Sequence, residues 1–153
     1  MSVETKHIAA FILAAAAAID ANAEEVTALD QAIGDGDHVT NLQRGLGVLA
    51  GLAPDLGALD WSAAFQKMGM SVMSTVGGAS GSLYGTFFLA LAKSLKGREL
   101  DQAALAEAFA AGVASMKQRG KADLGEKTML DVLIPVAEAL QKAAADAAPL
   151  AQT

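Results

Sequence analysis

Apolar residues recur every three or four positions along most of the chain, and strict alternation of apolar and polar residues never persists. This spacing predicts helices and no strand. We expect the first helix from about Val3 to Asp30, and the second from near His38 to the break at "GLAPDLG". Asp60 is a candidate cap for a third helix, and "TVGGASGS" separates that helix from a fourth.

The last third of the chain predicts two more helices. Asp101 is expected to cap the fifth, and "RGKADLGEK" is expected to be a loop. The sixth helix should run from near Thr128 to about Ala147, with Pro135 kinking it or shifting its first turn.

Six helices joined by short loops predict an all-α fold, an up-and-down antiparallel helical barrel or bundle, in a single domain over residues 1–153. The connections between helices one and two, three and four, and five and six all hold glycine and polar residues, and in this arrangement they emerge at the same end. The connections around Pro54 and Gly97 emerge at the other end and are typical of plain linkers.

Composition and charge exclude several classes of function. Hydrophobic residues make up 53% of the chain and aromatic residues 5%, which favours helices packed through Ala and Leu. The net charge of −6 argues against nucleic-acid binding. The absence of cysteine excludes disulfides and thiolate metal sites. The apolar run at 8–19 is too short to span a membrane and no basic segment precedes it, so we expect a cytoplasmic protein.

The first loop, "DQAIGDGDHVTNLQRG", places Asp30, Asp35 and Asp37 within eight positions. Carboxylates without soft ligands suit Mg²⁺, Mn²⁺ or Ca²⁺. Gly34 and Gly36 would let the chain turn sharply and bring the carboxylates together, where they repel one another unless a cation neutralises them. Three carboxylates could serve a pair of ions on a polyphosphate.

This loop has two other possible interpretations. An EF-hand starting at Asp35 would need Gly at its sixth position and Glu at its twelfth, which are Thr40 and Leu46, so the EF-hand is excluded. An acidic turn in which Asp37 only caps the second helix stays open.

Two segments are suited to bind an anion. His38, Thr40 and Asn41 lie in the first turn of the second helix, where free N–H groups and the helix dipole favour a phosphate. The segment "TVGGASGSLYG" has the composition of a loop that wraps an anion, although it also fits a tight turn between helices. Basic residues of "RGKADLGEK" would add positive charge at the same end. Alternatively, they only keep the surface solvated.

Three segments occur in order along most of residues 25–140: "LDQAIGDGDHVTNLQRG", "GMSVMSTVGGASGSLYGTFF" and "RGKADLGEKTMLDVLIPV". Together they resemble the L subunit of the phosphotransferase-dependent dihydroxyacetone kinase, which is similar to the nucleotide-binding domain of the ATP-dependent kinases. The resemblance implies an antiparallel helical barrel of eight helices, of which about six are expected here, with a nucleotide at one end.

The resemblance also assigns residues. It implies that ADP or ATP is held through two Mg²⁺ ions, with Asp30, Asp35 and Asp37 as the metal ligands. The implied nucleotide-binding residues are His38, Thr40 and Asn41 at the second helix, Ala79 and Ser80 in the glycine-rich loop, and Gly120 and Met129 beside the adenine. No residue of this chain is expected to act as a catalytic nucleophile.

The resemblance implies partners as well. An M subunit of the phosphotransferase system would supply the phosphoryl group, and a K subunit would hold dihydroxyacetone. A nucleotide-sensing module, or a kinase domain for another substrate, remains an alternative. The family continues with two further helices, so this sequence would be part of a longer chain or a shortened relative. An open flank would then favour a homodimer.

Overall fold

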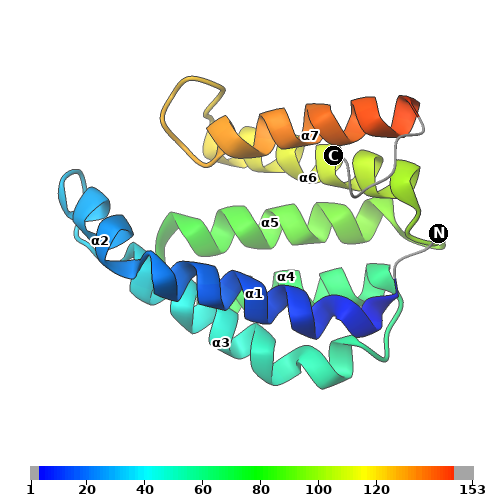
Figure 1. The fold of residues 1–153 in the computed structure, drawn as a ribbon, viewed down its shortest axis with the longest axis horizontal. Helices are drawn as coiled ribbons and strands as arrows, with labels where there is room; N and C mark the ends of the chain where they lie inside the picture. Colours follow the sequence, from blue (N-terminus) through cyan, green and yellow to red (C-terminus); the bar gives the residue numbers. More distant parts are fainter. Residues whose placement is uncertain (1–3, 147–153) are drawn as a thin grey trace.

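The computed structural model describes residues 4–146, and all regular structure in that range is helical. The elements are a 3-10 helix η1 (Thr5–His7) and seven α-helices: α1 (Ile8–Ala21), α2 (Ala23–Gln31), α3 (His38–Leu56), α4 (Trp61–Thr75), α5 (Gly78–Ser94), α6 (Gln102–Gly120) and α7 (Leu130–Ala145). The helices run up and down in the order of the chain, as Figure 1 shows, which confirms the predicted all-α arrangement.

The single first helix predicted from Val3 to Asp30 is wrong, because the helix breaks at Asn22 and α2 departs from α1 at 63°. The side-chain amide of Asn22 donates to the Ala18 carbonyl at 2.8 Å, so it satisfies a carbonyl that the next turn would have used. Glu24 and Glu25 then lie in the first turn of α2, where negative charge stabilises a helix start. Val3 lies outside the described residues.

The predicted caps of α4 and α6 are confirmed. Asp60 accepts a hydrogen bond from the Ala63 amide at 2.8 Å, and Asp101 accepts one from the Ala104 amide at 2.7 Å. Helix α3 starts at His38 as predicted but continues through Pro54 to Leu56, so Pro54 belongs to the last turn of a helix and not to a linker.

The last helix differs from the prediction at its start. Helix α7 begins at Leu130, and the Thr128 hydroxyl accepts a hydrogen bond from the Leu130 amide at 3.2 Å, so Thr128 caps the helix from two residues upstream. Pro135 lies inside α7. The predicted end at Ala147 lies outside the described residues.

The loops sort into two ends of the molecule, as predicted. In Figure 1 the α2–α3, α4–α5 and α6–α7 loops lie together on the left, and the α3–α4 and α5–α6 connections lie on the right. We call these the loop end and the linker end. Neighbouring helices pack as α1 with α3, α3 with α4, α4 with α5, α5 with α6, and α6 with α7.

The core lies between these helices and is almost entirely aliphatic and aromatic; its most deeply buried large side chains are Leu56, Leu95 and Met116. Five of the helices also surround an apolar cavity of about 490 Å³, with Phe65, Phe87 and Phe109 in its wall. No single helix in the described part of the chain is both long and apolar enough to cross a membrane.

Candidate functional site

Three carboxylates converge at the loop end. Asp30 lies in the last turn of α2, and Asp35 and Asp37 lie in the loop that follows it. Each offers a ligand atom, and these atoms all lie within 4.8 Å of one another. Asp30 is half-buried and the other two are exposed. A set of carboxylate oxygens at this spacing suits a hard divalent cation, so the structure brings together the predicted metal ligands.

Glycine makes this convergence possible. The Gly34 amide donates to the Asp30 carbonyl at 2.6 Å, which closes the turn. A Cβ at position 34 would lie only 2.8 Å from Asp30 Oδ1, so any larger residue would displace the carboxylate. Gly36 has a φ of +78°, a backbone conformation that other residues rarely adopt.

The alternative that Asp37 merely caps α3 is wrong. Asp37 occupies the N-cap position, but its side chain makes no capping hydrogen bond. The Asp30 carboxylate instead accepts from the His38 amide at 3.1 Å, across eight residues. Asp30 therefore fastens the start of α3 to the end of α2, and the Asp37 carboxylate remains available to a ligand.

The glycine-rich loop begins α5 beside this cluster. Gly77 is the N-cap, no side chain caps the helix, and a Cβ at Gly81 would lie 2.0 Å from the Val76 carbonyl oxygen. The loop therefore folds back on itself in a way that only glycine at position 81 allows. The Ser80 hydroxyl lies 3.2 Å from His38 Nδ1, 42 residues away in the chain, so the starts of α3 and α5 are neighbours. Ala79 is exposed in the same turn.

Two helix starts are thus left open next to the carboxylates. Among the described residues, nothing accepts a hydrogen bond from the amides of residues 39 and 40 in α3 or of residues 78–80 in α5. Free amides at a helix start, together with the helix dipole, form a site for an anion. The arrangement can therefore hold a cation and a phosphate side by side.

Asn41 is buried at the junction of these segments, and Arg44 contacts it. Arg44 Nη1 donates to Asn41 Oδ1 at 3.2 Å. Sequence reasoning missed Arg44, although its spacing of three residues from Asn41 puts both on one helix face. Thr40 lies apart from this contact, because it lines a surface hollow with Gln31 and Gly36 on the side of α2.

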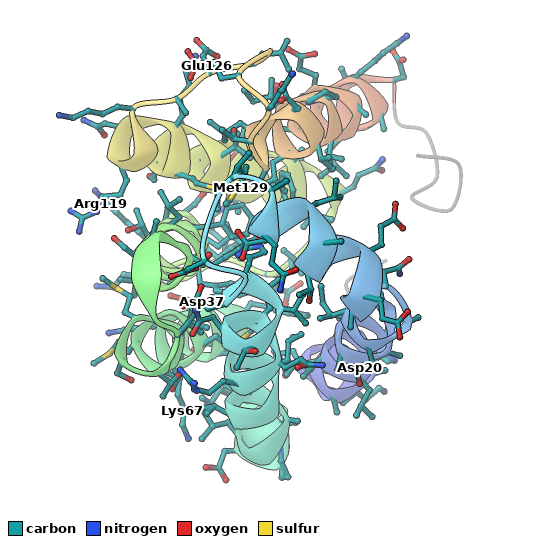
Figure 2. The ribbon with its side chains drawn as sticks, turned by 90° about the vertical axis from the view of Figure 1, so that its left-hand side faces the viewer. Asp20, Asp37, Lys67, Arg119, Glu126 and Met129 are labelled. Atoms are coloured by element: carbon teal, nitrogen blue, oxygen red, sulfur yellow. The ribbon has the colours of Figure 1, made fainter. Side chains whose placement is uncertain are left out.

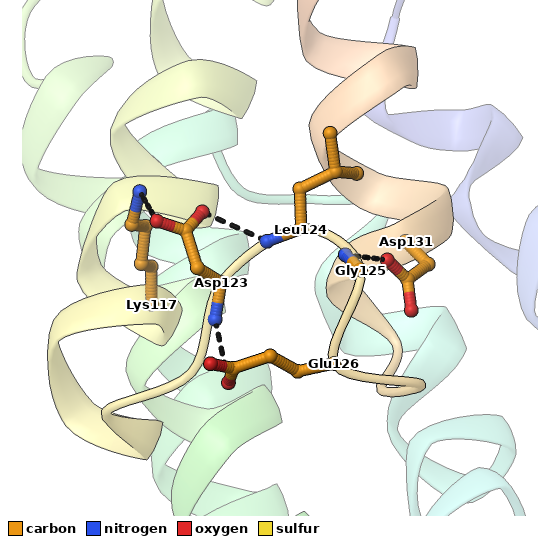
Figure 3. Close-up of polar contacts among 6 residues, drawn as sticks. All are labelled: Lys117, Asp123, Leu124, Gly125, Glu126 and Asp131. Atoms are coloured by element: carbon orange, nitrogen blue, oxygen red, sulfur yellow. Dashed lines mark hydrogen bonds and ion pairs between the residues drawn. The ribbon is translucent and has the colours of Figure 1, made fainter.

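The α6–α7 loop uses its acidic residues to hold its own shape (Figure 3). Asp123 forms an ion pair with Lys117 at 2.6 Å and accepts from the Leu124 amide at 2.8 Å. The hydrogen bond from Lys117, followed by that from the Leu124 amide, lowers the pKa of Asp123. Asp131 accepts from the amides of Gly125 and Thr128. Sequence reasoning missed this role of Asp131.

Gly120 and Met129 flank that loop. Gly120 ends α6 and is exposed, and Met129 is half-buried just before α7. Figure 2 looks onto the loop end and shows Met129 above Asp37. None of the contacts among the described residues joins Gly120 or Met129 to the carboxylates, so their place beside an adenine stays a prediction. Arg119 instead turns to α5, where its Nε donates to the Ser82 hydroxyl at 2.9 Å.

Comparison with known proteins identifies the family of this chain. The sequence model described as the DAK2 domain matches residues 32–153, which is most of the chain. This chain belongs to the DAK2-domain family. The resemblance drawn from the three segments is therefore confirmed at the level of the family.

The names of several relatives of this DAK2-family chain state a kinase activity. It is 42% identical over 124 residues to a protein of Listeria innocua named PEP-dependent dihydroxyacetone kinase 1, ADP-binding subunit DhaL, covering 81% of this chain and 63% of that protein. It is 40% identical over 120 residues to the corresponding Escherichia coli subunit, covering 78% and 57%. The triokinase/FMN cyclase of Rattus norvegicus is 38% identical over 120 residues, covering 77% of this chain and 20% of that protein.

A solved structure supports the fold. The crystal structure of the dihydroxyacetone kinase of C. freundii in its native form matches with a TM-score of 0.78 and 28% identity, covering 88% of this chain and 24% of that one. The DAK2-family chain therefore has the fold of a part of that kinase. It spans 57–63% of the length of the two bacterial subunits described above.

Proposed function

We propose that this chain is the nucleotide-binding part of a cytoplasmic dihydroxyacetone kinase. It holds ADP or ATP with magnesium, and it passes a phosphoryl group from a phosphotransferase-system partner, the M subunit, to dihydroxyacetone on a K subunit. The observation that carries the proposal is the convergence of Asp30, Asp35 and Asp37 beside two open helix starts. The names of the two bacterial relatives, both ADP-binding subunits, support it.

The donor set fits magnesium. All three side chains offer oxygen, and each has at least one carboxylate oxygen without a partner among the described residues. Magnesium takes one or two carboxylates and completes its shell with water and phosphate oxygens, so three carboxylates suit two ions on one diphosphate. When bound, Mg²⁺ would neutralise charge between the carboxylates and the phosphates and favour transfer of the terminal group.

The protein residues would orient the phosphates. Free amides of α5 at Ala79 and Ser80 would donate to phosphate oxygens, and the Ser80 hydroxyl beside His38 adds a further polar contact. Holding the phosphoryl donor and the phosphoryl acceptor in line supplies much of the rate acceleration in phosphoryl transfer. No catalytic nucleophile is assigned to this chain, because the hydroxyl that accepts the phosphoryl group would come from the substrate on a partner.

Reconstitution tests the transfer. The chain is mixed with K and M subunits, phosphoenolpyruvate, Mg-ADP and dihydroxyacetone, and dihydroxyacetone phosphate is measured. We expect product with the unchanged chain and at least about a tenfold lower rate with Asp35→Asn, since removing one metal ligand weakens the phosphate site. Arg98→Ala, at the linker end, is the matched control and should leave the rate unchanged. Mg-ADP binding without any product would instead favour a nucleotide-sensing module.

The similarity to triokinase/FMN cyclase favours a second candidate within the same class, a kinase for another short sugar. Because the substrate would be bound by another protein or domain, this chain holds no determinant that separates the two candidates. The two candidates are distinguished by the partner that accepts the phosphoryl group, and product formation with a glyceraldehyde-binding partner but none with the dihydroxyacetone-binding K subunit would replace the first proposal.

A further inference from the structure

Asn41 is an unusual residue in this interior. It lies in the first turn and a half of α3 with only 6% of its surface exposed, and among the described residues it is the single buried polar side chain. Burying an amide without partners costs free energy, so its position must be held by specific contacts.

Two neighbours hold the amide. Arg44 Nη1 donates to Asn41 Oδ1 at 3.2 Å. On the other side lies Gly77, the N-cap residue of α5, where a Cβ would come within 3.1 Å of Oδ1 and 3.7 Å of Nδ2. The amide is thus fixed between its own helix and the glycine-rich loop.

These contacts determine which way the amide faces. A guanidinium has only donors, so it can pair with the oxygen of the amide and not with the nitrogen. With Oδ1 occupied by Arg44, Nδ2 keeps its two donors; none of the described residues accepts from them, and the atom is not shut off from solvent, so a ligand can reach it. A donor with no acceptor, at the junction of the two open helix starts, is suited to an anion.

We propose that Arg44 is a positioning residue for the bound nucleotide: it holds Asn41 Oδ1 so that Nδ2 donates to a phosphate oxygen. This rests on the proposed function, because it assumes that the anion at the loop end is a nucleotide phosphate. Arg44 itself is exposed and need not touch the ligand. Without Arg44, the amide can rotate by half a turn and present its oxygen, which repels phosphate.

A double-mutant cycle on Mg-ADP affinity, measured by calorimetry, tests this role. We expect Asn41→Ala to weaken binding about tenfold, the loss of one hydrogen bond to a charged group. Arg44→Ala should weaken binding about fivefold, and the double variant should bind no worse than Asn41→Ala alone, because Arg44 acts only through Asn41. Losses that multiply in the double variant, or unchanged affinity in Arg44→Ala, would overturn the proposal.

Two controls separate positioning from charge and from folding. Arg98→Ala removes another exposed arginine, paired with Glu107 at the linker end, and should leave the affinity unchanged. Asn41→Asp keeps the shape and the contact with Arg44 but presents oxygen to the phosphate, so it should bind at least as weakly as Asn41→Ala while unfolding at the temperature of the unchanged protein or above.

A ligand-free measurement keeps this inference distinct from the proposed function. In the NMR spectrum of the protein without nucleotide, the two side-chain amide protons of Asn41 should shift in Arg44→Ala and stay in place in Arg98→Ala. Unshifted signals in Arg44→Ala would refute the positioning role even if Mg-ADP binds. Shifted signals together with no Mg-ADP binding by the unchanged protein would refute the nucleotide assignment, and with it this proposal, but leave the Arg44–Asn41 contact established.

Discussion

The two ends of the molecule use the same residue type in different ways. At the linker end, Asp60 and Asp101 each accept a hydrogen bond from an amide in the first turn of α4 and α6. At the loop end, Asp37 occupies the N-cap position of α3 but its side chain makes no capping hydrogen bond, and the N-cap residue of α5 is Gly77, which has no side chain. Asp60 and Asp101 therefore serve the fold at the linker end, whereas Asp37 remains open to a ligand at the loop end.

This difference agrees with the binding site proposed at the loop end. A helix start without a side-chain cap leaves amides free for another partner, and beside the clustered carboxylates we propose that this partner is a ligand. The loop end is not uniform, since Asp123 in the α6–α7 loop and Asp131 in the first turn of α7 are both engaged within the protein. The open groups belong to the α2–α3 and α4–α5 loops.

The largest expected effect comes from filling the space beside Asp30. In Gly34→Ala, the new Cβ would lie 2.8 Å from Asp30 Oδ1 and would push the carboxylate out of the cluster. We expect at least a tenfold loss of Mg-ADP affinity, about 1.4 kcal/mol or more. The ligand-free protein should lose only about 1 kcal/mol of stability, the contribution of the hydrogen bond that the His38 amide donates to Asp30.

Gly47→Ala is the matched control for that change. Position 47 is exposed in α3 with no atom within 4 Å of an added Cβ, so the variant should bind Mg-ADP normally and be stabilised by about 0.5–1 kcal/mol. Equal affinities of the two glycine variants would show that Asp30 does not contribute to binding.

A smaller effect, on the stability of the ligand-free protein, should separate the capping Asp60 from the uncommitted Asp37. Asp60→Ala removes a cap and should destabilise the protein by about 1 kcal/mol in denaturant unfolding. Asp37→Ala removes no capping hydrogen bond and relieves repulsion among carboxylates, so the ligand-free protein should be no less stable. A loss of stability in Asp37→Ala as large as in Asp60→Ala would refute the distinction between the two ends.

The smallest effect concerns the α6–α7 loop and depends on pH. The hydrogen bond from Lys117 lowers the pKa of Asp123 below its usual value of 3.8, so the contact stabilises the folded state above that pH and is lost as the pH falls through the lowered pKa. Asp123→Asn should therefore unfold at a slightly lower temperature at pH 7. The difference should vanish in acid and shrink in high salt, because the pair is exposed. A difference that persists below the lowered pKa would contradict this account.

Features that depend on residues close together in the chain could be predicted from the sequence. The caps Asp60 and Asp101 and the cluster of Asp30, Asp35 and Asp37 depend on residues close together in the chain, so the sequence was enough to predict them. The break at Asn22 was not predicted, because apolar spacing continues past it and the deciding contact is a side-chain hydrogen bond to Ala18.

Contacts between distant segments could not be predicted from one sequence. The approach of Ser80 to His38 depends on how α3 and α5 pack, and the packing of Asn41 against Gly77 depends on the same geometry. The pairing of Arg44 with Asn41 is local, but its significance follows only once Asn41 is known to be buried.

Calorimetric titration of Mg-ADP tests the central claim most directly. It compares the unchanged chain with Asp35→Asn and Asp37→Asn at the loop end, and with Asp60→Asn at the linker end, where asparagine still caps the helix. We predict that both loop-end variants lose at least about tenfold in affinity and that Asp60→Asn binds like the unchanged chain. Unchanged Mg-ADP affinity in both loop-end variants would contradict the account.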